Sequence, residues 1–284
     1  MEHKTLFYAA YALQITVISI VVPMWIKNRL QQMLKAHPPT EYPKLYPVSP
    51  GRIASTLTHF SLLNALVVLM GLAILGHVMF TAQEELLGWD NQGALIVYFL
   101  LQYLPFLYLG SQGFRYHQMM RQMNTSSERK AQLMPRNLAD HVSPVWFVVI
   151  GLSALSYIGT VVYIAQDPFE GFAGYWNILY VCLLNLFFWV MIRAQLHGKK
   201  HDPHQSHHDR LQQQQLICQV LVIGWLMANL FLTSNMWLAK LDMRDLNVVI
   251  QSLYFTLITL LMSQTSTHQP TDYSVYQATP EEAR

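Results

Sequence analysis

Seven long apolar segments, separated by polar loops, limit what this chain can fold into. About 20 consecutive apolar residues in a helix cross the roughly 30 Å of hydrocarbon in a bilayer. Because lipid offers no hydrogen-bond partners, a span must be a helix or a strand of a closed barrel. The segments are apolar on every face and lack the alternation of barrel strands. We therefore predict an all-α, polytopic membrane protein, a bundle of about seven transmembrane helices. The predicted spans are residues 6–25, 60–80, 93–110, 145–164, 174–192, 216–238 and 246–263.

The basic residues are confined to alternate loops, and this predicts the orientation of the chain. Residues 27–52, 115–136 and 193–210 hold five, five and four of the 18 Lys and Arg. Residues 81–92 and 165–175 hold none, and carry acidic residues instead. Short loops rich in Lys and Arg stay in the cytoplasm. We expect the three basic loops and the C-terminus to be cytoplasmic and the N-terminus outside, in a membrane such as the bacterial inner membrane.

Composition excludes several classes of protein. The chain is 52% hydrophobic and 12% charged, whereas soluble proteins carry about 25% charged residues. A net charge of +2, with basic residues dispersed among apolar helices, does not fit a nucleic-acid-binding protein. Membrane lipids are the expected partners of the basic loops, which could also bind a protein partner. The first apolar segment lacks a small-residue cleavage site and is interpreted as a retained helix, not a signal peptide.

We divide the chain into a transmembrane helical domain, residues 1–263, and a polar C-terminal tail, residues 264–284. The tail is expected to be disordered or loosely docked. The proline-rich segment 36–51 should resist helix formation and is interpreted as a strap along the bundle or as a docking segment for a partner. Span, basic loop and span recur three times before the last helix, which suggests repeated helical hairpins. Two competing alignments between residues 68–84 and 148–167 leave a true duplication open.

A histidine-rich segment in the third basic loop is the first candidate site. It reads HGKKHDPHQSHHD and holds five of the 12 histidines of the chain. Imidazole binds zinc, copper and nickel, and a flexible loop could gather several rings. The spacing does not match a defined zinc site, so a solvated, pH-sensitive loop is the alternative. The candidate metal ligands are His197, His201, His204, His207 and His208.

Amide side chains inside the predicted spans are the second candidate site. Amides in lipid form hydrogen bonds across helices, and they either join the bundle together or line a path for an uncharged solute. No Asp or Glu lies in the core of a predicted span, which argues against a proton pump or a proton-coupled cation carrier. The possible polar lining comprises Gln14, Asn64, Gln102, Asn185, Asn229 and Gln251.

The sequence carries no motif that identifies an enzyme or a cofactor. It has no phosphate-binding loop, no HExxH and no GxSxG. A haem held by one pair of histidines among His59, His117 and His141 remains a minor alternative. We expect a non-enzymatic integral membrane protein without a resident cofactor, either permease-like or a scaffold that binds a partner. The alternative is a metal-handling protein, holding a divalent metal in the histidine-rich loop. An intramembrane enzyme or a haem protein is a lower alternative.

Overall fold

The computed structural model describes residues 2–81, 93–124, 137–198, 202–268, 270 and 272–278. These residues form helices and their connections, with no strand among them, which confirms the all-α prediction. The long helices are α1 (Glu2–Thr16), α2 (Val22–Ala36), α3 (Pro50–Thr81), α4 (Gly93–Met123), α5 (Val145–Ile164), α6 (Trp176–His197), α7 (His207–Lys240) and α8 (Leu246–Thr267). Short helical turns are the π-helical η1 (Val17–Val21) and the 3-10 turns η2 (Pro43–Leu45), η5 (Leu138–Asp140) and η6 (Ser274–Tyr276).

The first two helices are parts of one continuous rod. The backbone stays in the right-handed helical region at Thr16, Val21 and Val22, and η1 joins α1 to α2 without a break. A π-helical turn inserts an extra residue into the helix and changes which side chains face the neighbours. When α1 and α2 are counted as one rod, the described chain has seven long helices.

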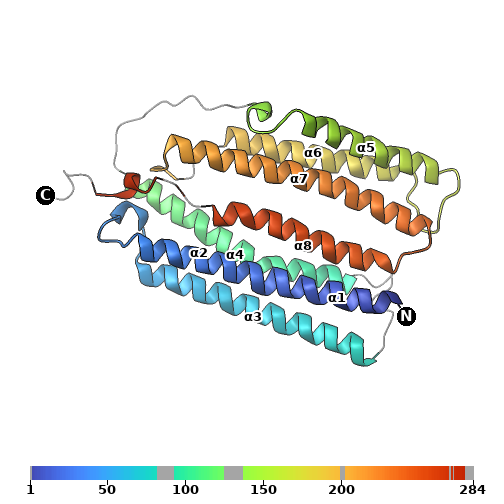
Figure 1. The fold of residues 1–284 in the computed structure, drawn as a ribbon, viewed down its shortest axis with the longest axis horizontal. Coiled ribbons are helices and arrows are strands. Elements are labelled where there is room, and N and C mark those ends of the chain that lie inside the picture. Colours follow the sequence, from blue (N-terminus) through green and yellow to red (C-terminus); the bar gives the residue numbers. More distant parts are fainter. Residues whose placement is uncertain are drawn as a thin grey trace.

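Length and composition fit a membrane protein. Six of the described helices are long and apolar enough to cross a bilayer. The seventh, α4, has 31 residues and is about 46 Å long at 1.5 Å per residue; it runs beside the others in the bundle (Figure 1). Large apolar side chains such as Leu69, Leu155 and Phe187 are exposed on the outer helix faces. Apolar surface on this scale suits lipid and not water.

The helices pack as two groups joined through α8. The rod α1–α2 packs on α3 and α8, and α3 packs on α4. In the second group α5 and α6 pack on α7, and α7 packs on α8. One core cluster contains Tyr11, Ile15 and Tyr98, and the other contains Cys218 and Val222. The predicted hairpin of α4 and α5 is therefore divided between the two groups, and a duplication of hairpins stays a prediction.

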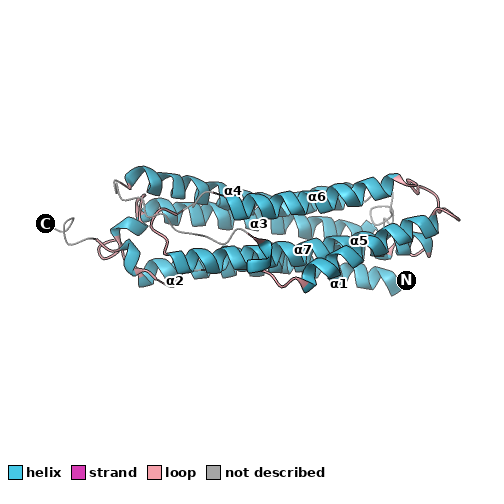
Figure 2. Ribbon diagram, turned by 90° about the horizontal axis from the view of Figure 1, so that it is seen from above, coloured by secondary structure: helices cyan, strands magenta, loops and turns pink. Residues whose placement is uncertain are grey.

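The bundle is elongated (Figures 1 and 2), and the loops at its two ends differ in charge. We call the end that holds the α2–α3 and α6–α7 connections and the C-terminal segment the basic end; the N-terminus lies at the opposite, acidic end. At the acidic end Lys240 Nζ lies 2.5 Å from Asp167 Oδ2, and Arg244 donates to the Glu170 carbonyl. The Lys240 ammonium lowers the pKa of the Asp167 carboxyl. The basic residues of the described parts of the three loops thus share one end of the bundle.

Several helices are longer than the apolar segments that predicted them. The α3 helix begins at Pro50, ahead of the predicted start at 60, and α4 continues to Met123. The α7 helix begins at His207, where the hydroxyl of Ser206 caps it by accepting from the Asp209 amide at 3.1 Å. Hydropathy marks the part of a helix that suits lipid, whereas the hydrogen-bonded helix continues until a cap or a proline ends it. The predicted bounds of α5 agree with the structure.

The C-terminal segment docks on the basic end. Tyr276 in η6 is buried and packs with Leu45 of η2 and Met120 of α4. Of the two expectations for the tail, docking and not disorder describes residues 272–278, because two aromatic rings among its polar residues supply an apolar contact. The proline-rich segment, for which we keep the name strap, connects α2 to α3 at the basic end and contains η2, whose Leu45 is buried.

Candidate functional site

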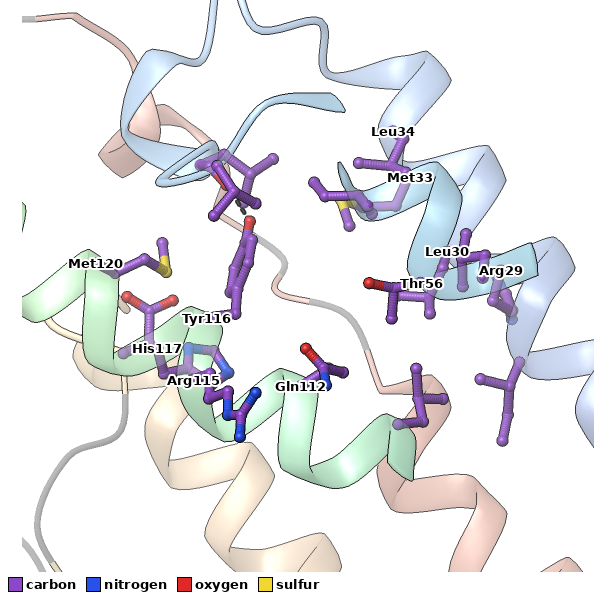
Figure 3. Close-up of a pocket in the computed structure, with 18 of the residues that line it drawn as sticks. Arg29, Leu30, Met33, Leu34, Thr56, Gln112, Arg115, Tyr116, His117 and Met120 are labelled. Atoms are coloured by element: carbon purple, nitrogen blue, oxygen red, sulfur yellow. Dashed lines mark hydrogen bonds between the residues drawn. The ribbon is translucent and has the colours of Figure 1, made fainter. Parts of the chain in front are cut away.

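A cavity of about 490 Å³ lies at the basic end, between α2, α3, α4 and the segment that follows α8. Figure 3 shows Leu30 and Met33 of α2 on one side and Gln112 and Tyr116 of α4 on the other. The volume is in the range of about 300–1,000 Å³ that is typical of small-molecule sites. No motif or residue spacing in the sequence predicts this cavity.

Helical periodicity places the lining residues on common faces. Most of the α4 residues that line the cavity are spaced three or four apart, which puts them on one side of the helix, and Arg115, His117 and Met119 lie beside that face. The cavity face of α2 has the same spacing. The lining of α4 includes Phe106, Leu109, Gln112, Gly113, Tyr116 and Met120, and that of α2 includes Ile26, Leu30, Met33 and Leu34.

The floor of the cavity is apolar and its mouth is basic. Ile26 and Leu57 are buried and, together with Phe106, line the deeper part, toward the middle of the bundle. Nearer the end of the bundle the lining includes three exposed arginines, one from each helix: Arg29, Arg52 and Arg115. Guanidinium groups bind carboxylates and phosphates through several N–H donors. The cavity therefore combines an apolar interior with a rim that holds three arginines, and its lining also includes one carboxylate, Asp202.

Among the polar atoms of the residues that line the cavity, Nε2 of His268 and the hydroxyl oxygen of Tyr273 are buried and have no hydrogen-bond partner in the protein. Buried polar groups are nearly always paired, so an orphaned pair beside a cavity indicates that a partner molecule could satisfy them. Burial and the nearby Asp209 carboxylate raise the pKa of Tyr273 to about 12, so this phenol is a donor at neutral pH.

The roof of the cavity comes from three segments that are distant in sequence. The phenol of Tyr276 donates to Asp202 Oδ2 at 2.5 Å, and the Asp272 amide donates to Asp209 Oδ2 at 3.3 Å. The ring of Tyr273 stacks on His37, with 3.6 Å between centroids. On the other side Tyr116 donates to the Leu45 carbonyl. The tail is thus held by the α6–α7 connection and by the proline-rich strap.

The structure does not bring the predicted histidine ligands together within its described residues. His201 lies outside the described residues. His197 is exposed at the end of α6, where its Nδ1 contacts the Arg193 carbonyl at 3.0 Å. His208 pairs with Gln212, and the His204 ring lies against Tyr276 at 6.2 Å. No group of three or more His, Cys, Asp or Glu in the described chain could hold a metal ion.

The remaining histidine of that loop, His207, begins α7, and its Nδ1 is buried without a hydrogen-bond partner. The two carboxylates beside these histidines face the tail instead of a metal. Asp202 accepts from Tyr276 and from the His204 amide, and Asp209 accepts from Ser206 and Asp272. Of the histidines considered for haem, His59 is exposed on α3, His117 lines the cavity and His141 is buried next to η5.

The intramembrane amides form two separate clusters, one in each helix group. Gln14 Nε2 donates to Gln102 at 2.6 Å, and Gln102 donates to Ser19 of η1 at 3.1 Å. In the other group Asn229 donates to Ser153 at 3.0 Å and pairs with Asn185. These bonds join helices across the bundle, in keeping with the structural interpretation of the amides.

The other two amides of the predicted lining lie apart from these bonds. Asn64 donates to the Phe60 carbonyl within α3. Gln251 and Gln14 line a second cavity of about 10 Å³ with Tyr11, which is the size of one water molecule. This small space is not a passage for a solute.

The arginines that line the cavity were counted among the basic loop residues, and no cavity was predicted from them. Arg29, Arg52 and Arg115 were interpreted as determinants of orientation, which is the commonest role of basic loop residues. Tyr273 and Tyr276, two aromatic residues in an otherwise polar tail, were the other available clue. No protein-family model matches the chain, and comparisons with curated proteins and with solved structures find no significant match.

Proposed function

We propose that this chain is an integral membrane protein that binds an anionic amphiphile, a molecule with a negatively charged head and an apolar chain. The basic end faces the cytoplasm in this proposal, with the N-terminus outside, because basic loops are retained on the cytoplasmic side. A bacterial inner membrane suits this arrangement. The cavity then lies at the depth where lipid head groups meet the hydrocarbon.

One observation carries the proposal: three arginines from three different helices line a cavity whose deeper wall is apolar. An anionic head at Arg29, Arg52 and Arg115 and an apolar chain beside Ile26 and Phe106 would use both parts. A small hydrophilic anion would leave the apolar wall wet, and a neutral lipid would make no use of the positive charge at Arg52 and Arg115. An amphiphile satisfies both requirements.

Binding is proposed in preference to transport through the bundle. Four of the six amides that could line a passage form two hydrogen-bonded pairs, and Gln102 is fully buried and bonded to Gln14 and Ser19. The protein would therefore present or sense its ligand at the cytoplasmic surface, which is the partner-binding alternative to a permease. A protein partner would bind the basic surface around the cavity and distinguish the ligand-bound protein from the free one.

Native mass spectrometry of lipid retention tests the proposal. The protein is purified in detergent and mixed with phosphatidylglycerol or with phosphatidylcholine of the same acyl chains. We expect retention of the anionic lipid, and a loss of about fivefold in affinity for Arg115→Gln, since one Arg near an anionic head contributes about 1 kcal/mol.

The matched control is Arg121→Gln. Arg121 is exposed in the last turn of the same helix and is not part of the cavity lining. Equal losses in the two variants would mean that the lipid responds to overall charge and not to the cavity, and would reject the proposed site. Equal retention of both lipids by the wild type would reject an anionic ligand.

A further inference from the structure

The C-terminal segment forms part of the cavity wall without belonging to one of the long helices. His268, Pro270 and Tyr273 line the cavity together with side chains of α2, α3 and α4. The regular structure among residues 272–278 is the three-residue turn η6. Such a segment lacks the continuous backbone hydrogen bonds of a long helix, so it can open locally while the bundle stays folded.

A few side-chain contacts hold this part of the wall in place. The Tyr276 phenol donates to Asp202 Oδ2 at 2.5 Å, and the Tyr276 ring is buried. The Tyr273 ring stacks on His37, with 3.6 Å between centroids. Docking of the segment is therefore an equilibrium set by a small number of contacts, and one further favourable interaction in the docked state shifts it.

The Asp202 carboxylate lines the cavity and also anchors the segment. Its Oδ1 accepts from the His204 amide at 2.8 Å, and its Oδ2 accepts from Tyr276. Its negative charge opposes an anion placed beside it. The anionic head of the ligand is therefore expected beside Arg52 of α3 and Arg115 of α4, away from this anchor.

The docked segment offers a ligand two polar atoms that are otherwise unused. His268 Nε2 and the Tyr273 hydroxyl are buried and have no hydrogen-bond partner among the described residues. The phenol can donate or accept, and the imidazole nitrogen does one or the other according to its tautomer. Uncharged ester or hydroxyl groups in the neck of a lipid can pair with both without any change of protonation. A ligand gains these contacts only while the segment is docked.

We infer that ligand binding and docking of the C-terminal segment are coupled, so that a ligand in the cavity fastens the segment and an undocked segment weakens binding. This inference rests on the proposed function and describes its regulation. By linkage, the factor by which the ligand strengthens docking equals the factor by which docking strengthens binding. The segment would then differ between the ligand-bound and the free protein, and a protein partner could recognise that difference.

Hydrogen exchange of residues 272–278 tests the coupling in the full-length wild type in detergent. It is measured without lipid, with saturating phosphatidylglycerol, and with phosphatidylcholine of the same acyl chains. We expect phosphatidylglycerol to slow exchange about tenfold, within the range of about 5–150-fold that is typical of coupled sites. Phosphatidylcholine should leave the exchange rate unchanged. Faster exchange with phosphatidylglycerol would mean that the lipid displaces the segment, and would overturn the inference.

A variant that undocks the segment tests the reciprocal effect. Val275 packs in the cluster of Leu45 and Tyr276 but does not line the cavity, so Val275→Asp should release the segment without removing a ligand contact. Its affinity for phosphatidylglycerol, measured by native mass spectrometry, should fall by the factor found for exchange in the wild type. The matched control is Gln277→Asp, which adds the same charge at an exposed position of the segment and should keep docking and affinity.

The outcomes distinguish this inference from the proposed function. Unchanged exchange in the wild type, while phosphatidylglycerol binds in an Arg115-dependent manner, would overturn the coupling and leave the binding site. Wild-type affinity in a Val275→Asp protein whose segment is undocked by hydrogen exchange would do the same. Absence of any Arg115-dependent binding would overturn both. If Val275→Asp fails to fold or stays docked, the wild-type comparison decides by itself.

Discussion

The hydroxyl of Tyr276 donates a hydrogen bond to Asp202 Oδ2 at 2.5 Å, joining two residues 74 positions apart in the chain. Asp202 lies in the histidine-rich connection between α6 and α7, and Tyr276 lies in the C-terminal segment. The bond holds the tail over the cavity, where Tyr276 is buried against Leu45 and Met120. This contact couples the chain terminus to the site.

Removing the Tyr276 hydroxyl should loosen the tail without unfolding the bundle. In Tyr276→Phe the ring stays buried. The Asp202 carboxylate loses the hydrogen bond from the phenol and keeps the one from the His204 amide. A hydrogen bond to a charged group is worth about 1.5–3 kcal/mol, so the undocked fraction should rise by one to two powers of ten. Hydrogen exchange of residues 272–278 measures this. Protection equal to that of the wild type would mean that packing alone docks the tail. Tyr42→Phe is the control.

High pH should release the tail. The pKa of Tyr273 is raised to about 12 from an ordinary value near 10, first by burial and then by the Asp209 carboxylate. Burial and the Asp202 carboxylate also raise the pKa of Tyr276. A raised pKa means that docking is at full strength below pH 10 and is lost as the pH rises through about 12. Fluorescence anisotropy of a dye attached at Ala278→Cys, in a background without the native cysteines, follows the release. A midpoint below pH 10 would contradict this explanation.

A methyl group at Gly71 should destabilise the first helix group. A Cβ there would collide with the hydroxyl of Tyr98, which donates to the Val67 carbonyl at 3.3 Å. Overpacking of this kind costs about 1–3 kcal/mol. We expect Gly71→Ala to lower the thermal midpoint of the detergent-solubilised protein. Gly76→Ala in the same helix meets no atom within 4 Å and should be neutral or slightly stabilising. A neutral Gly71→Ala would show that Tyr98 moves freely.

Zinc should leave the docked tail unchanged. The His204 ring lies against Tyr276, and Asp202 already accepts from Tyr276 and from the His204 amide. A metal that gathered these groups would have to break that arrangement. Elemental analysis measures whether the loop binds a metal. It compares the wild type with a variant in which His197, His201, His204, His207 and His208 are replaced. Near-stoichiometric zinc, copper or nickel that disappears in the variant would favour the metal-handling alternative over lipid binding.

Hydropathy and charge were sufficient to predict the bundle. The bounds of α5 follow directly from its apolar run, and the basic residues of the described loops gather at one end as the alternation of charge indicates. The starts of α3 at Pro50 and α7 at His207 did not follow from hydropathy, because a proline in the first turn and the Ser206 cap mark where these helices begin.

The cavity could not be predicted in the same way. Its lining combines Arg29, Arg115 and Tyr273 from segments that hydropathy treats as separate loops. Their proximity depends on how the rod α1–α2 packs on α3 and α8, and on which face η1 turns toward α4. The amides Gln14 and Gln102 were identified from the sequence as a polar group, but their mutual hydrogen bond depends on that same packing.

Filling the cavity is the most direct test of the proposed binding site. Gly113 on α4 lines the cavity, and a Cβ there meets no atom within 4 Å, so Gly113→Leu adds bulk at the cavity wall. Gly151→Leu is the control, because Gly151 is exposed on α5 and also has open space around it. We predict that Gly113→Leu loses the anionic lipid seen by native mass spectrometry, whereas Gly151→Leu retains it. Equal retention in both variants would contradict binding in this cavity.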